Sequence, residues 1–461
     1  MSKFFLYIIT IFTSFIVNAN EINQPKNVLF IMVDDLRPEL FVYTQDHIKS
    51  PNIDALAAQG VTFNRAYCNV PVCGASRASI LSGMRPTKDR FLVANSSINE
   101  AGPQIEHIVD YFNKRGYITI SNNKITHIKK DIKSWDEEWY PTDISWRNYQ
   151  DPKNRQLNKE KKPAAAYEML DVDDKVYFDG QTALKSIEDL KNLKNSNSPF
   201  FLAVGFVKPH LPFTAPKKYW DLYKESDIKL PNQNIFPESA PNQANHQWGE
   251  LRHYKGIPKK GPIDHEMSKT LIHAYYASVS YVDAQIGKIL NALDNFDLRD
   301  STVVVLVGDH GWSLSEHGLW AKHSNFEVAL HVPMIISAPN FPKNVKTNSI
   351  AELVDIYPTL CELTIGLKPK HLQGTSLVSS MRSPEKIIKT TALARWKRGE
   401  TLIQNDFFYT EWNLQSGRIS RMLYDHSIDP DETKNLAILK SYSDIVESLS
   451  QQLKRFKETF N

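Results

Sequence analysis

The chain has 461 residues, of which 41% are hydrophobic and 23% are charged, as in globular proteins with ample material for a core. Its formal net charge of +3 is too small and too evenly spread to indicate a nucleic-acid-binding protein. The three cysteines, Cys68, Cys73 and Cys361, are too few for a disulfide scaffold, and the odd count fits one cysteine used in chemistry.

Residues 1–20 have the pattern of a secretory signal peptide. Lys3 precedes the apolar run from Phe4 to Val17, and residues 18–20 are small enough for cleavage. A membrane anchor is the alternative, but the run is shorter than the roughly 20 apolar residues of a comfortable span. We therefore expect a periplasmic or secreted protein without stable membrane insertion.

Apolar, branched runs predict buried strands at 27–33, 200–207 and 302–307, and a fourth at 333–336. Ser50-Pro51 predicts the start of a helix, and one-sided apolar spacing predicts a long helix over about 268–293. Strands that alternate with helices indicate an α/β fold with a large, mostly parallel central sheet.

Two segments, 135–165 and 230–265, lack periodicity, and we predict long surface loops there. From about residue 385, short alternating segments and a helix near 442–456 predict a smaller antiparallel sheet with one helix. The expected organisation is a signal peptide over 1–20, a catalytic α/β domain over 21–384 and a C-terminal antiparallel subdomain over 385–461.

Polar residues follow the predicted strands directly: Asp34-Asp35, His210 and Asp309-His310. Open α/β sheets bind ligands at the carboxyl ends of their strands. Adjacent carboxylates repel one another unless a cation neutralises them, and hard oxygen ligands suit Ca²⁺ or Mg²⁺. Asp is also common in ordinary turns, but two such pairs at two strand ends predict a metal site.

The pentapeptide Cys73–Arg77 (Cys-Gly-Ala-Ser-Arg) resembles the maturation signature of type I sulfatases. In that family the Cys is oxidised after translation to formylglycine (3-oxoalanine), an aldehyde that becomes the catalytic nucleophile. The family commonly has Pro where Ala75 stands, although Ala occurs in related signatures. A Cys68–Cys73 disulfide is the competing interpretation, and it would block maturation.

Longer segments resemble the iduronate-2-sulfatase branch of this family. Residues 308–327 are the most specific, and 34–38, 50–54, 208–213, 276–283 and 423–425 with 429–430 also match, so the resemblance covers nearly the whole mature chain. It implies an alkaline-phosphatase-like sulfatase fold. It also implies one Ca²⁺ ion, held by Asp34, Asp35, Asp309, His310 and the modified Cys73.

The same resemblance implies roles for five further side chains. Arg77 stabilises the hydrated aldehyde, and Lys124 and His127 flank the nucleophile. His210 and Lys322 contact the sulfate and the leaving oxygen. Taken singly, a Lys or His at any of these positions would be an ordinary surface or loop residue.

Arg37 and Trp312 are candidates for the sugar pocket, although Trp312 is equally compatible with a place in the core. The implied reaction is hydrolysis of a sulfate ester, on 2-O-sulfated uronates or ulvan-type algal sugars and at a chain end. A formylglycine-generating maturation enzyme is the implied protein partner. Two alternatives stay open: a phosphate or phosphonate ester hydrolase of the same superfamily, and an inactive relative that binds sulfated glycan.

Overall fold

The computed structural model describes residues 26–43, 47–141, 146–232, 234–246 and 249–460, and the predicted signal peptide lies outside them. An eight-stranded sheet with the order β11-β2-β10-β9-β1-β7-β4-β5 forms the centre. Its strands are β1 (Asn27–Val33), β2 (Val61–Phe63), β4 (Ile118–Asn123), β5 (Glu137–Trp139), β7 (Phe200–Phe206), β9 (Thr302–Gly308), β10 (Met334–Ser337) and β11 (Val345–Thr347).

The middle of this sheet is parallel. Strands β9, β1, β7, β4 and β5 run in one direction, and β10 is antiparallel to β9 and β2. Every residue of β7 and β9 is buried because both faces of the sheet are covered, and such strands favour continuous apolar runs. The predicted α/β fold with a mostly parallel sheet is confirmed.

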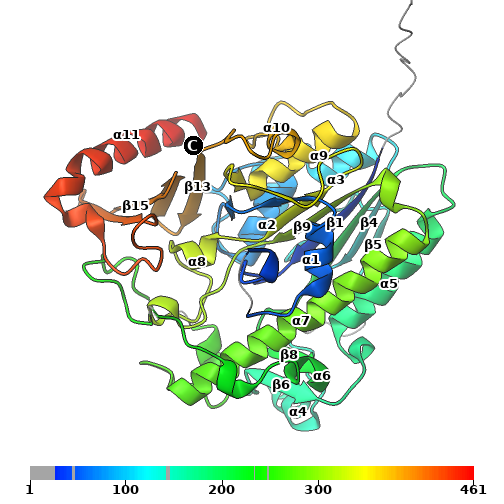
Figure 1. Ribbon diagram of the computed structural model, residues 1–461, viewed down its shortest axis with the longest axis horizontal. Helices are drawn as coiled ribbons and strands as arrows, with labels where there is room; N and C mark the ends of the chain where they lie inside the picture. Colours follow the sequence, from blue (N-terminus) through cyan, green and yellow to red (C-terminus); the bar gives the residue numbers. More distant parts are fainter. Residues whose placement is uncertain (1–25, 44–46, 142–145, 233, 247–248, 461) are drawn as a thin grey trace, which may run out of the picture.

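Helices cover both faces of the sheet (Figure 1). One layer contains α1 (Pro51–Ala57), α5 (Phe178–Leu193) and α7 (His265–Asn295), and the other contains α2 (Cys73–Ser82), α3 (Ile108–Asn113), α9 (Ile356–Thr364) and α10 (Val378–Arg382). The long helix begins earlier than predicted because the Asp264 carboxylate caps it, accepting from the Met267 N–H at 2.8 Å.

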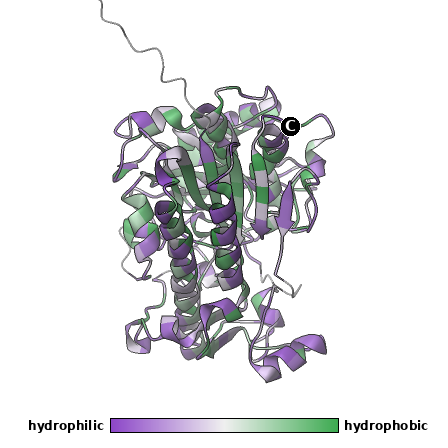
Figure 2. Cartoon of the chain, turned by 90° about the vertical axis from the view of Figure 1, so that its right-hand side faces the viewer, coloured by the Kyte–Doolittle hydropathy of each residue, from purple (hydrophilic) through white to green (hydrophobic). Residues whose placement is uncertain are grey.

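Alternation along β1 divides the hydrophobic core between the two layers. Leu29 and Ile31 pack with residues of α5 and α7, whereas Phe30 and Met32 pack with residues of α2 and α9. Successive side chains of a strand point to opposite faces, so one strand supplies both cores. Figure 2 shows the central strands as largely hydrophobic segments flanked by helices of mixed character.

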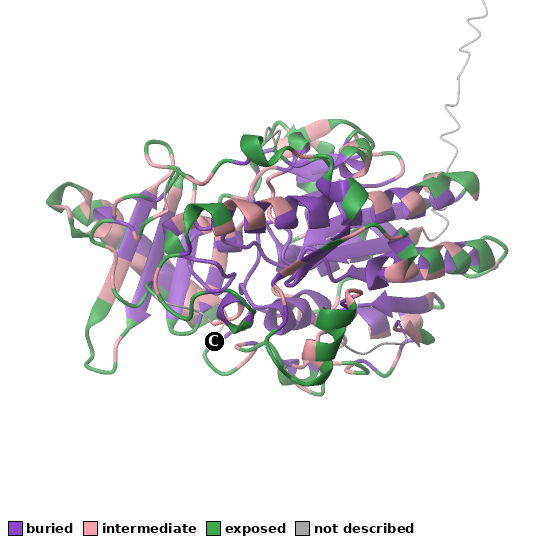
Figure 3. Cartoon of the chain, turned by 90° about the horizontal axis from the view of Figure 1, so that it is seen from below, coloured by how far each residue is buried: buried purple, intermediate pink, exposed green. Residues whose placement is uncertain are grey.

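A second, antiparallel sheet follows near the C-terminus. It consists of β13 (Thr391–Trp396), β14 (Gly399–Gln404), β15 (Phe407–Asn413) and β16 (Ile419–Asp425), and α11 (Ser443–Phe460) packs on it. Leu449 and Leu453 of the helix contact the apolar face of the sheet. Strands of both sheets are buried while the outer helix faces are exposed (Figure 3). The predicted small sheet with one helix is confirmed, and the division at residue 385 stays a prediction.

The prediction of an unstructured loop over 135–165 is wrong in part. This segment contains β5 and the helix α4 (Pro152–Lys159), whose first turn is capped by Asp151. The Asp-Pro pair is a helix-start signal that the absence of apolar periodicity concealed. The described part of 230–265 contains only a short 3₁₀ turn at Leu251–His253 before α7 begins.

Short elements complete the fold: β3 (Ala66–Tyr67) with β12 (Ala351–Glu352), β6 (Tyr167–Leu170) with β8 (Phe213–Pro216), α6 (Lys217–Trp220) and α8 (Glu327–Leu330). The thiols of Cys68, Cys73 and Cys361 are all free, so the alternative Cys68–Cys73 disulfide is not formed. Among the described residues, no helix has the length and apolarity required to cross a bilayer.

Candidate active site

Four neighbouring strands of the central sheet end at one edge, and each is followed by polar residues. Asp34-Asp35 follow β1, Asp309-His310 follow β9, Lys124 follows β4, and His210 lies four residues beyond β7. Val33 pairs with Gly308, so the first two pairs leave the sheet side by side. The carboxyl edge of a parallel sheet is where such folds bind ligands.

Cys73 reaches this edge as the first residue of α2 and is 2% exposed. A side chain at Gly74 would place its Cβ 1.8 Å from the Ala94 carbonyl oxygen, so glycine is required beside the cysteine. Ala75 occupies the first helical turn, where backbone N–H groups have no partner within the helix. Proline is tolerated in that turn for the same reason, so either residue fits here.

A cluster of possible metal ligands surrounds the Cys73 thiol. Oxygen, nitrogen and sulfur atoms of Asp34, Asp35, Cys73 and His310 all lie within 4.8 Å of one another, and all four residues are buried. The Cys73 Sγ is 3.2 Å from the His310 Nε2. The Oδ1 atoms of Asp34 and Asp35 are buried and accept no hydrogen bond from the described residues. Carboxylate oxygens without donors fit a hard divalent cation.

Asp309 lies beside this cluster with both carboxylate oxygens engaged. Its Oδ1 accepts from the Asp35 N–H at 3.2 Å, and its Oδ2 accepts from the Arg77 Nε at 2.8 Å. Asp35 has a positive φ of 61°, a strained conformation for a residue with a side chain. Asp309 therefore holds the backbone of one candidate ligand and the guanidinium of Arg77, and its own role as a ligand stays a prediction.

The two adjacent carboxyl groups have opposite electrostatic surroundings. Burial raises the pKa of Asp35 to about 7, and the nearby charge of Asp34 adds to this effect. Burial acts on Asp34 too, but Lys124, His210 and Arg77 hold its pKa well below the usual range. A carboxyl group with so high a pKa would be ionised fully at neutral pH only with another positive charge beside it, as a cation would provide.

Two lysines bring positive charge to the cluster. Lys124 forms an ion pair with Asp34, and the Lys322 Nζ lies 3.3 Å from the Asp35 Oδ1. Burial alone would lower their pKa values, but the neighbouring carboxylates and Cys73 raise both, so both amines stay protonated. Burial lowers the pKa of His127 to about 3, with help from Lys124. His127 is therefore neutral, and its Nδ1 atom has no hydrogen-bond partner in the described part of the chain.

These residues face a pocket of about 370 Å³. Its walls include the predicted residues Cys73, Lys124, His127, His210 and Lys322, and the aromatic side chains Tyr140, Trp146 and Phe178. The pocket also contains Glu250, which the sequence analysis did not single out because it lies in an aperiodic segment without a recognisable motif.

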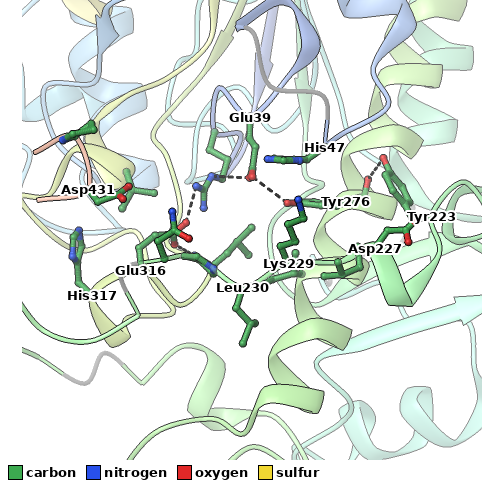
Figure 4. A pocket seen from close by; sticks show the side chains of 18 of the residues that line it. Glu39, His47, Tyr223, Asp227, Lys229, Leu230, Tyr276, Glu316, His317 and Asp431 are labelled. Carbon is green, nitrogen blue, oxygen red and sulfur yellow. Dashed lines mark hydrogen bonds and ion pairs between the residues drawn. The ribbon is translucent and has the colours of Figure 1, made fainter. Parts of the chain in front are cut away.

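Arg37 and Trp312 are not brought to this pocket. Trp312 is fully buried: its ring packs edge-on against Phe213, and the Lys322 Nζ lies 5.2 Å from its centroid. Arg37 forms ion pairs with Glu316 at 2.7 Å and Glu39 at 3.3 Å, and it lines a separate cavity of about 900 Å³ (Figure 4). Neither residue is among the described residues that line the Cys73 pocket, and their sugar-binding role stays a prediction.

Comparisons with known proteins agree with this geometry. The sulfatase family model matches residues 26–367, and the model of the C-terminal region of N-sulphoglucosamine sulphohydrolase matches residues 315–459. Human iduronate 2-sulfatase is 36% identical over 335 residues, which cover 70% of this chain and 61% of that protein. A sulfatase of Formosa agariphila is 31% identical over 471 residues, covering 96% of this chain and 88% of the relative.

Solved structures at lower identity share the fold. The phosphonate monoester hydrolase of Agrobacterium radiobacter superimposes with a TM-score of 0.79 at 21% identity, covering 95% of this chain and 96% of the other. A protein in complex with its substrate D-glucosamine-2-N,6-O-disulfate gives 0.77 at 19% identity, covering 95% and 98%. The family model and the closer relatives go further than fold: this chain belongs to the sulfatase family of sulfuric ester hydrolases.

Proposed function

We propose that this sulfatase removes sulfate from the ends of oligosaccharides derived from a sulfated polysaccharide, using formylglycine made from Cys73. One observation carries the proposal. Cys73, which the maturation signature singles out, lines a pocket together with the protonated Lys124 and Lys322, and it lies within 4.8 Å of the possible metal ligands Asp34, Asp35 and His310. A sulfate ester is an anion whose charge shifts toward the leaving oxygen as the S–O bond breaks, and preorganised positive charge is most effective there.

The cation, the modified cysteine and the side chains of the pocket would have different roles in the reaction. When bound at Asp34, Asp35, Asp309 and His310, Ca²⁺ would supply positive charge to the sulfuryl oxygens, and the hydrated aldehyde at position 73 would supply the nucleophilic hydroxyl. Lys124 and Lys322 bind the same oxygens through their ammonium groups. Arg77 lies beneath the nucleophile, fixed by Asp309, and keeps its charge next to position 73.

Proton transfer is assigned to two histidines. His210 lines the pocket and can donate a proton to the departing sugar oxygen. His127 is neutral because of burial and the charge of Lys124, and its Nδ1 has no hydrogen-bond partner among the described residues. The proton released when sulfate leaves position 73 is assigned to a ring nitrogen of His127, which lines the pocket together with Cys73.

The pocket supports a carbohydrate substrate attacked at a chain end. Its volume of about 370 Å³ is near the lower end of the roughly 300–1,000 Å³ typical of small-molecule sites. Tyr140 and Trp146 present aromatic rings that could stack on a sugar face. A 2-O-sulfated uronate is one candidate, in line with the name of the human relative. An ulvan-type algal sugar is the other.

Export and maturation belong to the same proposal. The apolar leader before the described residues indicates a periplasmic or secreted enzyme, and the Cys73–Arg77 signature indicates a maturation enzyme as a partner. Trypsin cleaves after Arg65 and Arg77, so the mass of the peptide Ala66–Arg77 reports directly on the modification. After co-expression with a maturation enzyme we expect the mass of the aldehyde form. The mass of an unmodified cysteine would instead support the alternative that the protein binds sulfated glycan without cleaving it.

The decisive experiment measures sulfate release by the matured enzyme from 2-O-sulfated uronate disaccharides and from lyase-generated ulvan fragments. Cys73→Ala is the blank, and Cys73→Ser should fail to turn over because a simple alcohol cannot expel the sulfate it accepts. Sustained turnover by Cys73→Ser would reject the mechanism. Release from one substrate class only would identify the substrate.

A phosphate or phosphonate ester is the second candidate, because the hydrolase of Agrobacterium radiobacter shares the fold. A phosphate monoester dianion requires more compensating charge than a monoanionic sulfate ester, and often a second metal. Because the described ligand cluster is a single one, it favours sulfate. Faster release of phosphate than of sulfate from matched aryl esters would reverse this assignment.

A further inference from the structure

Glu250 is the only acidic residue among the described residues that line the Cys73 pocket. Its Oε2 lies 3.1 Å from the Lys322 Nζ, and its Oε1 lies 3.0 Å from the His210 Nε2. Burial would raise its pKa, but Lys322 and His210 hold that pKa well below the usual range, so the side chain is an anion. A carboxylate inside a pocket for an anionic ester weakens binding of the substrate and therefore requires an explanation.

The contacts of Glu250 fix both of its partners. The His210 Nδ1 is 2.6 Å from the Leu211 carbonyl oxygen, and its Nε2 faces Glu250, so the imidazole ring is held at both nitrogens. The Lys322 ammonium lies between Asp35 at 3.3 Å and Glu250 at 3.1 Å, so its long side chain is held at the tip. A lysine side chain that is free in the empty pocket loses conformational entropy when the substrate binds and orders it. A lysine that is already held does not pay this cost.

We propose that Glu250 is a positioning residue that holds the Lys322 ammonium and the His210 Nε2 hydrogen in the pocket, from which that hydrogen passes to the oxygen that leaves with the sugar, while Glu250 itself does not touch the sulfuryl group. The inference rests on the proposed reaction, in which these two residues assist departure of the leaving group. Groups held in place before the reaction do not have to be ordered during it, which lowers the barrier more than it tightens ground-state binding.

The proposal predicts a dependence on the leaving group. A sugar alcohol is a poor leaving group and needs the aimed donors, whereas a nitrophenolate departs without them. Glu250→Gln should therefore lower kcat about 100-fold on the sugar sulfate that the wild type hydrolyses. On 4-nitrophenyl sulfate it should lower kcat only a few-fold. Glu250→Asp, which keeps the charge, should recover part of the loss. Glu225→Gln, an exposed Glu outside the pocket, is the matched control and should leave both rates unchanged.

Binding of inorganic sulfate provides a readout that does not depend on turnover. In a Cys73→Ala background, calorimetry should show that Glu250→Gln binds sulfate as tightly as its parent or more tightly, because a repelling carboxylate has been removed. Equal loss of kcat on both esters, no loss on the sugar sulfate, or weaker sulfate binding would each overturn the positioning role. If the wild type hydrolyses neither ester faster than the Cys73→Ala blank, the proposed function is wrong. The calorimetric comparison then still tests the role of Glu250, because it does not depend on turnover.

Discussion

Two of the cavities described near the ends of β1 and β9 differ in the burial and pairing of their charged residues. The Cys73 pocket is the smaller, about 370 Å³ against about 900 Å³ for the cavity of Figure 4. Asp34, Asp35 and Lys322 at the smaller pocket are at most 3% exposed. In the larger cavity, Arg37 is neutralised by Glu39 and Glu316. The lysines along its wall, such as Lys229, are exposed.

The two cavities therefore differ more in how their charges are held than in volume alone. Placing charges away from water costs several kcal/mol for each ion, so a folded chain keeps them buried where chemistry requires them or where they pair with one another. The residues around Cys73 carry such buried charges. The Oδ1 atoms of Asp34 and Asp35 also accept no hydrogen bond from the described residues. In the larger cavity, by contrast, Arg37 is paired and lysines such as Lys229 are exposed. Three experiments sharpen this contrast.

The largest effect should come from removing the divalent cation. Treatment with a chelator should abolish turnover, and Ca²⁺ should restore it better than Mg²⁺, which requires stricter octahedral geometry. Ca²⁺ at 100 times its Kd should also raise the free energy of unfolding by about 2.7 kcal/mol, measured by urea titration. Asp34→Asn should lose this stabilisation. Full activity after exhaustive chelation would show that the cluster does not work as a metal site.

A smaller effect should follow from removing one lysine at a time. Lys322→Ala should lower kcat about 100- to 1,000-fold, as expected when one preorganised group that stabilises transition-state charge is lost. Lys229→Ala, which removes an exposed lysine from the larger cavity, should leave kcat and KM unchanged. Steady-state kinetics on one substrate, with circular dichroism to confirm folding, decides the comparison. Similar losses in both variants would mean that the larger cavity also binds substrate.

The smallest effect concerns paired charges beside the larger cavity. The Glu432 carboxylate lies 3.3 Å from His426 and 3.4 Å from His317. Although burial would lower the pKa of His426, Glu432 and Glu327 raise it, against a smaller opposing effect of Arg65. A histidine whose folded pKa is raised stabilises the protein fully below its unfolded pKa, near 6.5, and this stabilisation is lost as pH rises through the folded value.

We therefore expect the free energy of unfolding to fall by less than about 1 kcal/mol as the pH rises from about 6 through the folded pKa of His426. Urea titrations at several pH values measure the slope. Glu432→Gln should flatten it while leaving kcat unchanged at neutral pH. An unaltered slope in this variant would mean that the Glu432 pair contributes no pH-dependent stability.

Site residues that lie close to a strand with a clear sequence pattern could be predicted, whereas those in segments without a pattern could not. Asp34 and His310 could be placed because they directly follow apolar strands, and parallel strand ends share one edge. Lys124 came only from the family resemblance, since β4 (Ile118–Asn123) ends in three polar residues and gave no strand signal. Glu250 reaches the pocket through tertiary contacts of an aperiodic segment, which no local pattern encodes.

The misplaced candidates show the limit of sequence proximity. Arg37 follows the candidate ligand Asp35 by two residues, and Trp312 follows His310 by two. Arg37 reaches Glu39 and Glu316, whereas Trp312 packs beside Phe213 and contacts the Lys322 ammonium from outside the pocket. Proximity along the chain predicted the neighbourhood of the site but not the direction of these side chains.

The burial of Cys73 also has a consequence for the order of events during synthesis. His310, which closes over the thiol, lies 237 residues further along the chain. At a translation rate of roughly 5–20 residues per second, Cys73 precedes this partner by about 10–50 s. For that interval β9 does not yet exist beside β1, and the helix that begins at Cys73 has no completed sheet edge to pack against. A modifying enzyme that acts during synthesis would therefore find this cysteine accessible for about 10–50 s before folding closes the site.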